Sequence, residues 1–298
     1  MTATTPPAPT TAASEEPATV SVPPRADCTA DTSGGLVFDV SGWQPARPGA
    51  RAELILLRRG ADPADGGVRL PLRPAGDGRL RAELPIGAEL PEGRWDAHVG
   101  TADDTDPGAA RPERLLPGVN DLRTLVDRVP APGGGPLAVR IPYPTKHGNL
   151  SLRSWVRAPH AEAGDLRPED GTLTVRGALH GVADPAGWLD GAVAEARRRS
   201  RPSVVSAPVT ADGAAFTFTL DHQELAGTWQ GGEEVWDLWL RPRSGDPARV
   251  ARLLDDIADR KPVFTYPARL VAAGHGPAHT APYYTVDNDL SVRVQPAG

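Results

Sequence analysis

Side chains able to do chemistry are sparse in this 298-residue sequence. His275 and His279 have the four-residue interval of a helical metal site, but the glycine and proline between them disfavour a helix. The acidic runs Asp287-Asn288-Asp289 and Asp103-Asp104-Thr105-Asp106 could each hold a divalent cation. A surface loop explains each of these segments more simply, so we predict no metal site and no cofactor.

The motifs that mark a nucleophile or a phosphate loop are missing as well. No Gly-x-Ser-x-Gly pattern occurs, and Gly133-Gly134-Gly135 lacks the strand-to-helix context of a phosphate loop. Cys28 is the only cysteine, which excludes an intrachain disulfide and a cysteine-based zinc cluster. Catalytic residues therefore cannot be assigned from the sequence.

The elements that position these residues belong to an internal repetition. Five segments of the first half recur in the same order in the second half, at similar offsets, so we interpret the pattern as a duplication. The matched segments are Pro142–Arg153 with Pro282–Arg293 (an offset of 140, from 142 to 282), Ala110–Leu116 with Ala248–Leu254, Trp95-Asp96 with Trp236-Asp237, Asp77-Gly78 with Asp212-Gly213, and Gly34-x-Leu36 with Gly171-x-Leu173.

Each copy contains six or seven short apolar runs separated by turn residues, which is typical of an immunoglobulin-like β-sandwich. The predicted fold class is all-β, with two tandem duplicated sandwiches and short helical insertions at Trp188–Arg199 and Pro247–Arg260. The predicted organisation is a disordered Thr/Ala/Pro-rich tail (1–27), a first sandwich (28–156), a linker (157–170) and a second sandwich (171–298).

Alternation along the strands predicts which side chains face the core. Trp95 and Trp236 fall on the apolar faces and are expected in the two cores. Trp155 and Trp239 fall on the opposite faces, where a tryptophan can stack on a sugar or anchor a partner. Packing under a loop or against the other copy is the alternative for both.

The outward faces also carry an aspartate and an arginine in each copy. If the strands are neighbours, Asp96 with Arg153 and Asp237 with Arg293 are expected to form cross-strand ion pairs. We take Trp155, Trp239, Asp237, Arg293 and Arg153 as the candidate binding residues.

Composition excludes several classes of protein. The net charge of −6 argues against a nucleic-acid binder, and no apolar run reaches the length of a transmembrane helix. The N-terminus lacks the basic and apolar regions of a secretion signal, so we expect a cytoplasmic protein. The excess of Arg over Lys, with abundant Ala, Pro and Gly, indicates a high-GC, actinobacterial genome.

The segment Pro142–Leu152, read as Pro-Tyr-x-Thr-x-x-Gly-Asn-Leu-Ser-Leu, resembles the C-terminal β-sandwich modules of actinobacterial cell-wall glycosyltransferases and of CDP-glycerol glycerophosphotransferase-like teichoic-acid polymerases. The resemblance covers both copies but rests on this motif and the tryptophan strand. It implies an association with glycan or secondary-metabolite assembly, with catalysis residing in a nucleotide-binding domain that this sequence lacks.

Two hypotheses of function follow. The first is a non-catalytic tandem β-sandwich accessory protein that binds a glycan polymer or a partner transferase. The second is a small transferase with an inter-domain active site, where Asp237, Arg293, Asp287 and His275 could converge. A structural dimerisation module is a third option, and the oligomeric state stays open.

Overall fold

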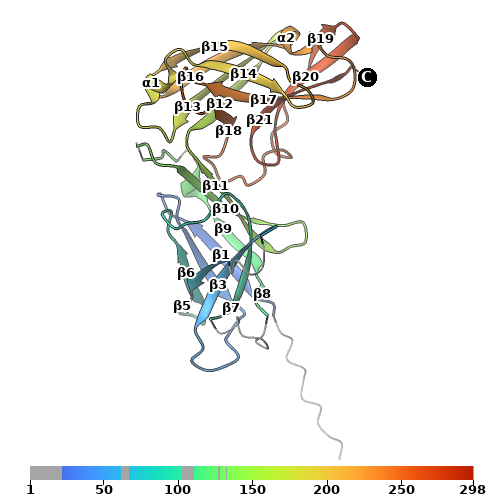
Figure 1. Cartoon of the computed structure of the whole chain (residues 1–298). Coiled ribbons are helices and arrows are strands. Elements are labelled where there is room, and N and C mark those ends of the chain that lie inside the picture. Colours follow the sequence, from blue (N-terminus) through green and yellow to red (C-terminus); the bar gives the residue numbers. More distant parts are fainter. Residues whose placement is uncertain (1–21, 62–66, 103–110, 127, 132, 298) are drawn as a thin grey trace, which may run out of the picture.

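The computed structural model describes residues 22–61, 67–102, 111–126, 128–131 and 133–297. The described chain is mostly β-structure and forms two parts, with the blue-to-green first part below and the yellow-to-red second part above in Figure 1. Strands β10 (Leu137–Pro144) and β11 (Leu150–Arg157) lie at the end of the first part that faces the second part in this view. Asp103–Asp106 and residues 1–21 of the predicted tail lie outside the described residues.

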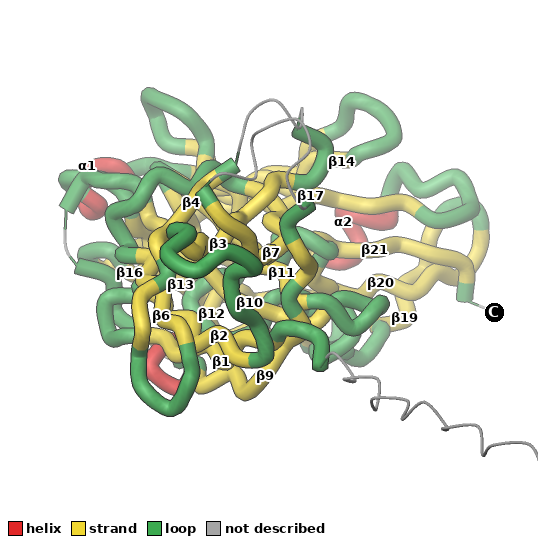
Figure 2. The backbone as a smooth tube through the Cα atoms, turned by 90° about the horizontal axis from the view of Figure 1, so that it is seen from below, coloured by secondary structure: helices red, strands yellow, loops and turns green. Residues whose placement is uncertain are grey.

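Two sheets enclose the core of the first part. One sheet has the strand order β5 (Arg73–Pro74), β6 (Leu80–Leu84), β2 (Leu36–Ser41), β1 (Arg25–Ala30) and β9 (Leu116–Asp121). The other has the order β10 (Leu137–Pro144), β11 (Leu150–Arg157), β7 (Gly93–Thr101), β3 (Ala52–Arg58) and β4 (Val68–Pro71), with β8 (Glu113–Arg114) paired to β7. Figure 2 shows strands of both sheets from below.

Alternation places apolar side chains of both sheets in one cluster. Phe38 of β2, Leu54 of β3 and Trp95 of β7 are almost fully buried in it, as expected for strands with one face against a core. Cys28 of β1, which lies between β2 and β9, is also buried there. Burial is the main cause that raises the pKa of its thiol, and the neighbouring Asp27 and Asp39 add to it. A short 3-10 helix at Arg123–Leu125 follows β9.

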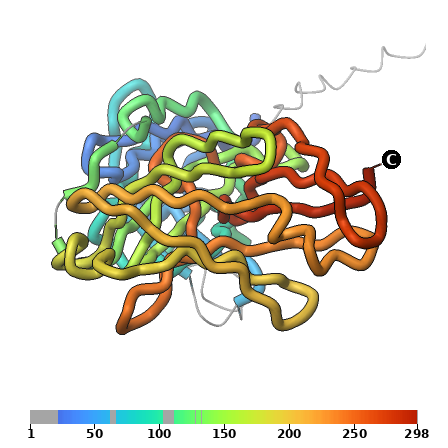
Figure 3. The backbone as a smooth tube through the Cα atoms, turned by 90° about the horizontal axis from the view of Figure 1, so that it is seen from above, coloured from blue at the N-terminus to red at the C-terminus, as the bar shows by residue number. Residues whose placement is uncertain are grey.

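The second part is one ten-stranded sheet. Its order is β14 (Val193–Arg198), β15 (Val204–Asp212), β16 (Ala215–Asp221), β13 (Thr172–His180), β12 (His160–Pro168), β18 (Ala248–Ala251), β17 (Glu234–Arg241), β21 (Leu290–Pro296), β20 (Gly276–Tyr284) and β19 (Arg269–Ala273). Because β14 also pairs with β17, part of the sheet closes on itself around a core that contains Trp236. Figure 3 shows these strands from above.

Strand β17 repeats the pairing pattern of β7. Strand β7 has β3 on one side and both β11 and β8 on the other, while β17 has β14 on one side and both β21 and β18 on the other. Trp95 and Trp236 are both buried, at 4% and 0% exposure, so the prediction that they are core residues is confirmed.

Two predicted boundaries are wrong. The segment from 157 to 170 contains β12, which pairs with β13 and β18, and therefore is not a linker. Residues 25–27 belong to β1 and not to a disordered tail. Ala251 and Leu253, within the predicted second sandwich, are buried in the apolar cluster of the first part.

The two predicted helical insertions are also wrong. In place of a helix over Trp188–Arg199, the chain forms α1 (Pro185–Leu189), capped by Asp184, and then strand β14. In place of a helix over Pro247–Arg260, it forms strand β18 followed by turns. The second described α-helix, α2, is His222–Ala226. None of the helices in the described ranges is long and apolar enough to cross a membrane.

Candidate functional site: a basic pocket beside the joint

Asp96 of β7 lies at the centre of a polar cluster. Its Oδ1 accepts hydrogen bonds from Arg59 Nε at 2.8 Å and from Ser151 Oγ at 2.7 Å. Arg114 of β8 forms an ion pair with the same oxygen at 3.3 Å. Arg59 also donates to Ser151 Oγ at 2.9 Å, so one carboxylate holds two guanidinium groups and a hydroxyl in fixed positions.

Asp237 of β17 has the corresponding partners in the second part. Arg199 Nη2 and Arg249 Nη2 donate to its Oδ1 at 2.6 and 2.8 Å, and Ser291 Oγ donates at 2.9 Å. Tyr143 and Tyr283 lie opposite Ser151 and Ser291 in the two ladders. The same set of residue types is therefore repeated at the same strand positions.

The electrostatics of the two aspartates are alike. Burial raises the pKa of Asp96, but the hydrogen bonds from Arg59 and Ser151 and the charge of Arg114 outweigh burial, and the pKa is lowered. Burial likewise raises the pKa of Asp237, and its arginine and serine partners again lower it overall. A carboxylate whose pKa is lowered is a weak general base near neutral pH.

The predicted cross-strand ion pairs do not form. The strands are neighbours as expected, but Ser151 and Ser291, not Arg153 and Arg293, lie opposite the two aspartates. Arg153 instead pairs with Asp287. The guanidinium group of Arg293 lies 4.7 Å from the ring centroid of Tyr283.

The repeat alignment predicted around Arg114 is also shifted. The strand register places Arg114 opposite His98, and Arg249 opposite Trp239, so these two arginines correspond. Their offset is 135 (249 − 114), whereas the predicted alignment of this segment used 138 (248 − 110). A loop of different length in the two parts accounts for the slip of three residues.

The prediction that Trp155 faces outward is wrong. Trp155 is 0% exposed, and its indole Nε1 donates to the carbonyl oxygen of Asp287 at 3.1 Å. It therefore packs against the other part of the molecule, which was the alternative. Trp239 stays partly exposed, with Arg197 and Arg249 at 4.8 and 5.4 Å from its ring centroid.

Matching turns join β10 to β11 and β20 to β21. In the second turn, Thr285 Oγ1 accepts hydrogen bonds from the backbone N–H groups of Asp287 and Asp289, both at 3.2 Å. Thr145 does the same in the first turn. Gly148 and Asn288 occupy the position with φ of 75° and 61°, a region that glycine and asparagine tolerate best.

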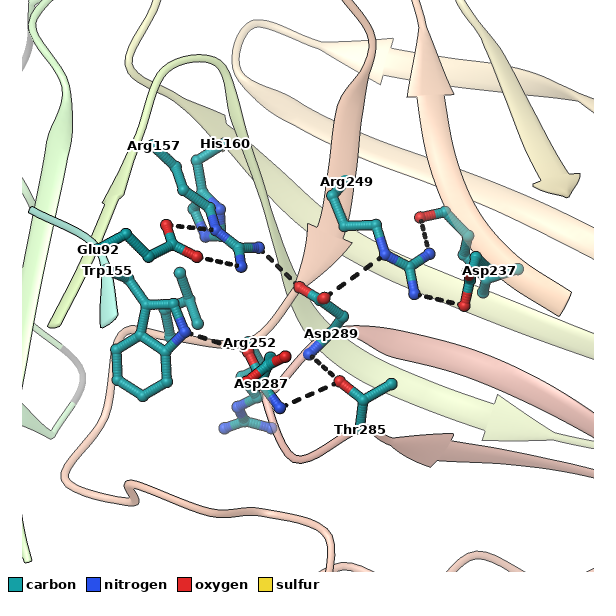
Figure 4. Close-up of polar contacts among 12 residues, drawn as sticks. Glu92, Trp155, Arg157, His160, Asp237, Arg249, Arg252, Thr285, Asp287 and Asp289 are labelled. Carbon is teal, nitrogen blue, oxygen red and sulfur yellow. Dashed lines mark hydrogen bonds and ion pairs between the residues drawn. The ribbon is translucent and has the colours of Figure 1, made fainter. Parts of the chain in front are cut away.

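The second turn is the joint between the two parts (Figure 4). Asp289 Oδ1 accepts from Arg157 Nη1 at 2.7 Å, and its Oδ2 lies 3.7 Å from Arg249 Nε. Arg157 in turn pairs with Glu92 at 3.1 Å. These ion pairs connect Asp237 of the second part, through Arg249, Asp289 and Arg157, to Glu92 of the first part.

A pocket of about 660 Å³ opens beside this joint. The first turn, from Thr145 to Asn149, forms one side, while Ala258, Asp259 and Val286 of the second part form another. Among the described residues, five cationic side chains line the pocket, against the carboxylates of Asp96 and Asp259: they are Arg59, Arg94, Arg114, Lys146 and Arg153. The lining thus has an excess of three positive charges (5 − 2).

Two buried nitrogens in the pocket wall lack hydrogen-bond acceptors in the described part of the chain. They are Arg153 Nε and Arg114 Nη1, and the latter lies 3.3 Å from Asp96 Oδ1 as an ion pair without a hydrogen bond. Arg153 is only 6% exposed. An unsatisfied buried donor costs about 1–3 kcal/mol, so these two arginines keep hydrogen-bonding capacity that the protein itself does not fully use.

A second pocket, of about 880 Å³, also lies between the two parts. Its lining is largely apolar and includes Ile86, Val129, Leu179 and Val182. Arg128 in its wall donates to the carbonyl oxygens of Ser33 and Ala138. The charged groups that could define a chemistry converge in the smaller pocket.

The four residues expected to form an inter-domain active site do not converge. Asp287 approaches the basic pocket, but His275 lies in the β19–β20 turn, at the opposite end of β20 from Asp287. A nine-residue strand such as β20 spans about 30 Å. Within the described ranges, no three His, Cys, Asp or Glu side chains are grouped to hold a metal ion.

Arg59, Arg94, Arg114 and Lys146 were missed by reasoning from the sequence. A signal for Arg59 exists, since Arg58-Arg59 and Arg198-Arg199 repeat at the offset of 140 that relates Pro142 to Pro282. No pattern marks Arg94 or Lys146, whose counterparts in the second part have other side chains.

Comparisons with known proteins give no family. No protein-family model and no curated protein matches the chain. Two solved structures show distant similarity, S. aureus TarS and its segment 217–571, each with 10% identity and a TM-score of 0.28. They cover 71% and 76% of this chain, which spans 38% and 62% of theirs. Similarity at this level shows neither a family nor a function.

Proposed function

We propose that this chain is a non-catalytic binding protein, built from two duplicated immunoglobulin-like β-sandwich units, whose basic pocket holds anionic groups of a glycan polymer. The observation that carries the proposal is the convergence of five cations on one pocket in a chain of net charge −6. Charge of the opposite sign to that of the whole molecule, gathered in one concave site, favours an anionic ligand.

The chemistry of the pocket supports binding over catalysis. Its central carboxylate, Asp96, has a lowered pKa, and Arg59 and Arg114 are guanidinium groups that do not give up a proton. Guanidinium groups held in place by a carboxylate and a hydroxyl are suited to phosphate or carboxylate recognition. Arg153 of the candidate residues lines this pocket, whereas Asp237, Arg293 and Trp239 belong to the second part.

The geometry indicates an anionic ligand. We infer that a glycan carries the anionic groups from the resemblance of Pro142–Leu152 alone. A partner transferase and a homo-oligomer stay predictions on the same basis. One observation favours the rival transferase, namely that the pocket has walls from both parts of the chain. The titration that tests the proposal therefore includes CDP-glycerol, an activated donor.

The test is calorimetric titration with three probes: a phosphodiester-linked wall glycan, a neutral glycan of similar length, and CDP-glycerol. We expect binding to the anionic polymer alone, weakening with added salt. Arg59→Gln should weaken it roughly ten- to a hundred-fold, the loss of one or more charge-assisted hydrogen bonds. Arg199→Gln, the matched change in the second part, should have little effect.

If the charged and the neutral polymer bind equally well, or if both variants lose the same affinity, the basic pocket is not the binding site. Tight binding of CDP-glycerol followed by its turnover would replace the binding role by the transferase.

A further inference from the structure

The joint places a carboxylate of the second part against the cations of the first. Asp287 Oδ1 accepts a hydrogen bond from Arg153 Nη2 and lies 3.4 Å from Arg94 Nη2. Both arginines line the basic pocket. The carboxylate side chain is 48% exposed, while that of Arg153 is 7% exposed, so the acid is the accessible member of the pair.

The backbone and the side chain of Asp287 are held by different groups. Trp155 Nε1 donates to the backbone carbonyl, and the backbone N–H donates to Thr285 Oγ1. The carboxylate has no such anchor to its own part among the contacts that the structure shows. It can therefore leave the arginines by a side-chain rotation while the turn stays in place.

The neighbouring Asp289 differs in this respect. It is 19% exposed and lies between Arg157 and Arg249, neither of which lines the pocket. Its carboxylate joins the two parts and is not accessible to a ligand in the pocket. The two acids of the turn thus have different surroundings, although they are two residues apart.

We propose that Asp287 determines the affinity and specificity of the basic pocket, by acting as an internal anion that a ligand must displace from Arg94 and Arg153. This inference rests on the proposed function. A tethered carboxylate competes at a high effective concentration, so a free monoanion gains little by replacing it. A ligand that carries several charges also engages Arg59 and Arg114, and these contacts offset the free-energy cost of displacing Asp287.

The first turn shows whether the turn needs an acid at the position of Asp287. His147 corresponds to Asp287, since each follows its threonine by two residues in the same hydrogen-bonding pattern. His147 lines the pocket together with Lys146 and adds no negative charge. An acid at this position is therefore not required by the turn itself.

The experiment uses inorganic pyrophosphate and acetate as probes, titrated into the whole chain by calorimetry. Asp287→Asn should bind pyrophosphate more tightly than the unaltered protein, by roughly ten-fold or more, because the variant removes the negative charge that competes for Arg94 and Arg153. The same variant should gain measurable acetate binding. Asp287→Glu, which keeps the charge, should retain weak acetate binding and near-original pyrophosphate affinity.

Asp289→Asn is the matched control, expected to lower the melting temperature without raising either affinity. If Asp287→Asn folds and binds pyrophosphate no more tightly than the unaltered protein, Asp287 is a joint residue only and the proposed function stands. If neither protein binds pyrophosphate or the anionic polymer, both the inference and the proposed function fail.

Discussion

At the scale of single residues, the structure uses aspartates to orient arginines. Asp96 holds Arg59 and Arg114, and Asp237 holds Arg199 and Arg249. Because each carboxylate is already compensated, the arginines keep fixed directions, and little side-chain entropy is left to lose on binding. In the first part this leaves guanidinium donors that face a pocket.

Replacement of Asp96 by Asn should destabilise the fold by roughly 1–3 kcal/mol at pH 7, the range for buried hydrogen bonds to charged groups. The pKa of Asp96 is lower in the folded chain than its unfolded value of about 3.9. Its stabilising effect is therefore complete above that value and is lost as the pH falls through the folded pKa. Urea unfolding at pH 7 and pH 3 measures both effects.

The difference between the variant and the unaltered protein should shrink at pH 3. Asp190→Asn is the control, because Asp190 and its partner Arg243 are 71% and 70% exposed and such a pair contributes little. A deficit for Asp96→Asn that is as large at pH 3 as at pH 7 would show that charge is not the cause.

Replacement of Trp155 by Ala should reduce the free energy of unfolding by about 3–5 kcal/mol, since it leaves a large cavity in a fully buried site. Trp155→Phe should cost less but leaves the carbonyl of Asp287 without its indole donor. Chemical denaturation measures these losses, with Trp239→Ala as the partly exposed comparison. A stability change no larger than that of Trp239→Ala would contradict the assignment of Trp155 to the joint.

At the scale of elements, one type of turn serves two purposes. Thr145 begins a turn at the rim of the basic pocket, and Thr285 begins one that contacts the first part. In the second turn, Asn288 is fully buried, accepts from the backbone N–H of Arg260 at 2.9 Å and donates to the carbonyl of Ile257 at 3.0 Å. The asparagine side chain thus attaches the turn to the segment that follows β18.

Asn288→Gly should keep the turn, because Gly148 occupies the same place in the first part, but it should cost about 1–3 kcal/mol through the two lost hydrogen bonds. Asn288→Ala should cost roughly 1 kcal/mol more, since alanine resists positive φ. Thermal melts of both variants test the order. Equal melting temperatures for the two would contradict the left-handed geometry assigned to this turn.

Elements were predictable from the sequence where their pattern reflects local geometry. The alternation around Trp95 and Trp236 identified both strands and their buried faces. Val250, Leu253, Leu254 and Ile257 have the apolar spacing of a helix. The segment is not a helix, because Val250 and Leu253 are buried in the cores of different parts. Only the tertiary arrangement reveals this.

The candidate site was less predictable than the fold. Arg153 was chosen as a candidate, but its predicted partner was Asp96 and its actual partner is Asp287, 134 residues away. Strand parity gives the face of a sheet on which a side chain lies. It does not say what covers that face, and here the second part covers Trp155 and Arg153.

At the scale of the whole molecule, the two parts share structure. Ala251, the last residue of β18, and Leu253, which follows that strand, are buried with the apolar residues of the first part. Glu162 of β12 accepts hydrogen bonds from the backbone N–H groups of Leu253 and Leu254. Unfolding the first part therefore exposes apolar side chains of the second part, and unfolding the second part removes the hydrogen bonds that hold Leu253 in place.

We expect a single cooperative transition in scanning calorimetry of the whole chain. Arg157→Ala removes the ion pairs to Glu92 and Asp289 at a site where the arginine side chain is 15% exposed, and it should lower the melting temperature and broaden or split the peak. Arg243→Ala, at an exposed ion pair, serves as the control. Two separate transitions in the unaltered protein would show that the joint does not couple the parts.

The burial of Cys28 has a practical consequence. The thiol lies on β1, between β2 and β9 and inside the apolar cluster, and its raised pKa keeps it in the unreactive, protonated form. An alkylating reagent can modify it only when β1 separates from its neighbours. Since the chain has no other cysteine, the rate of alkylation under native conditions would report the opening frequency of this one strand, with no introduced probe.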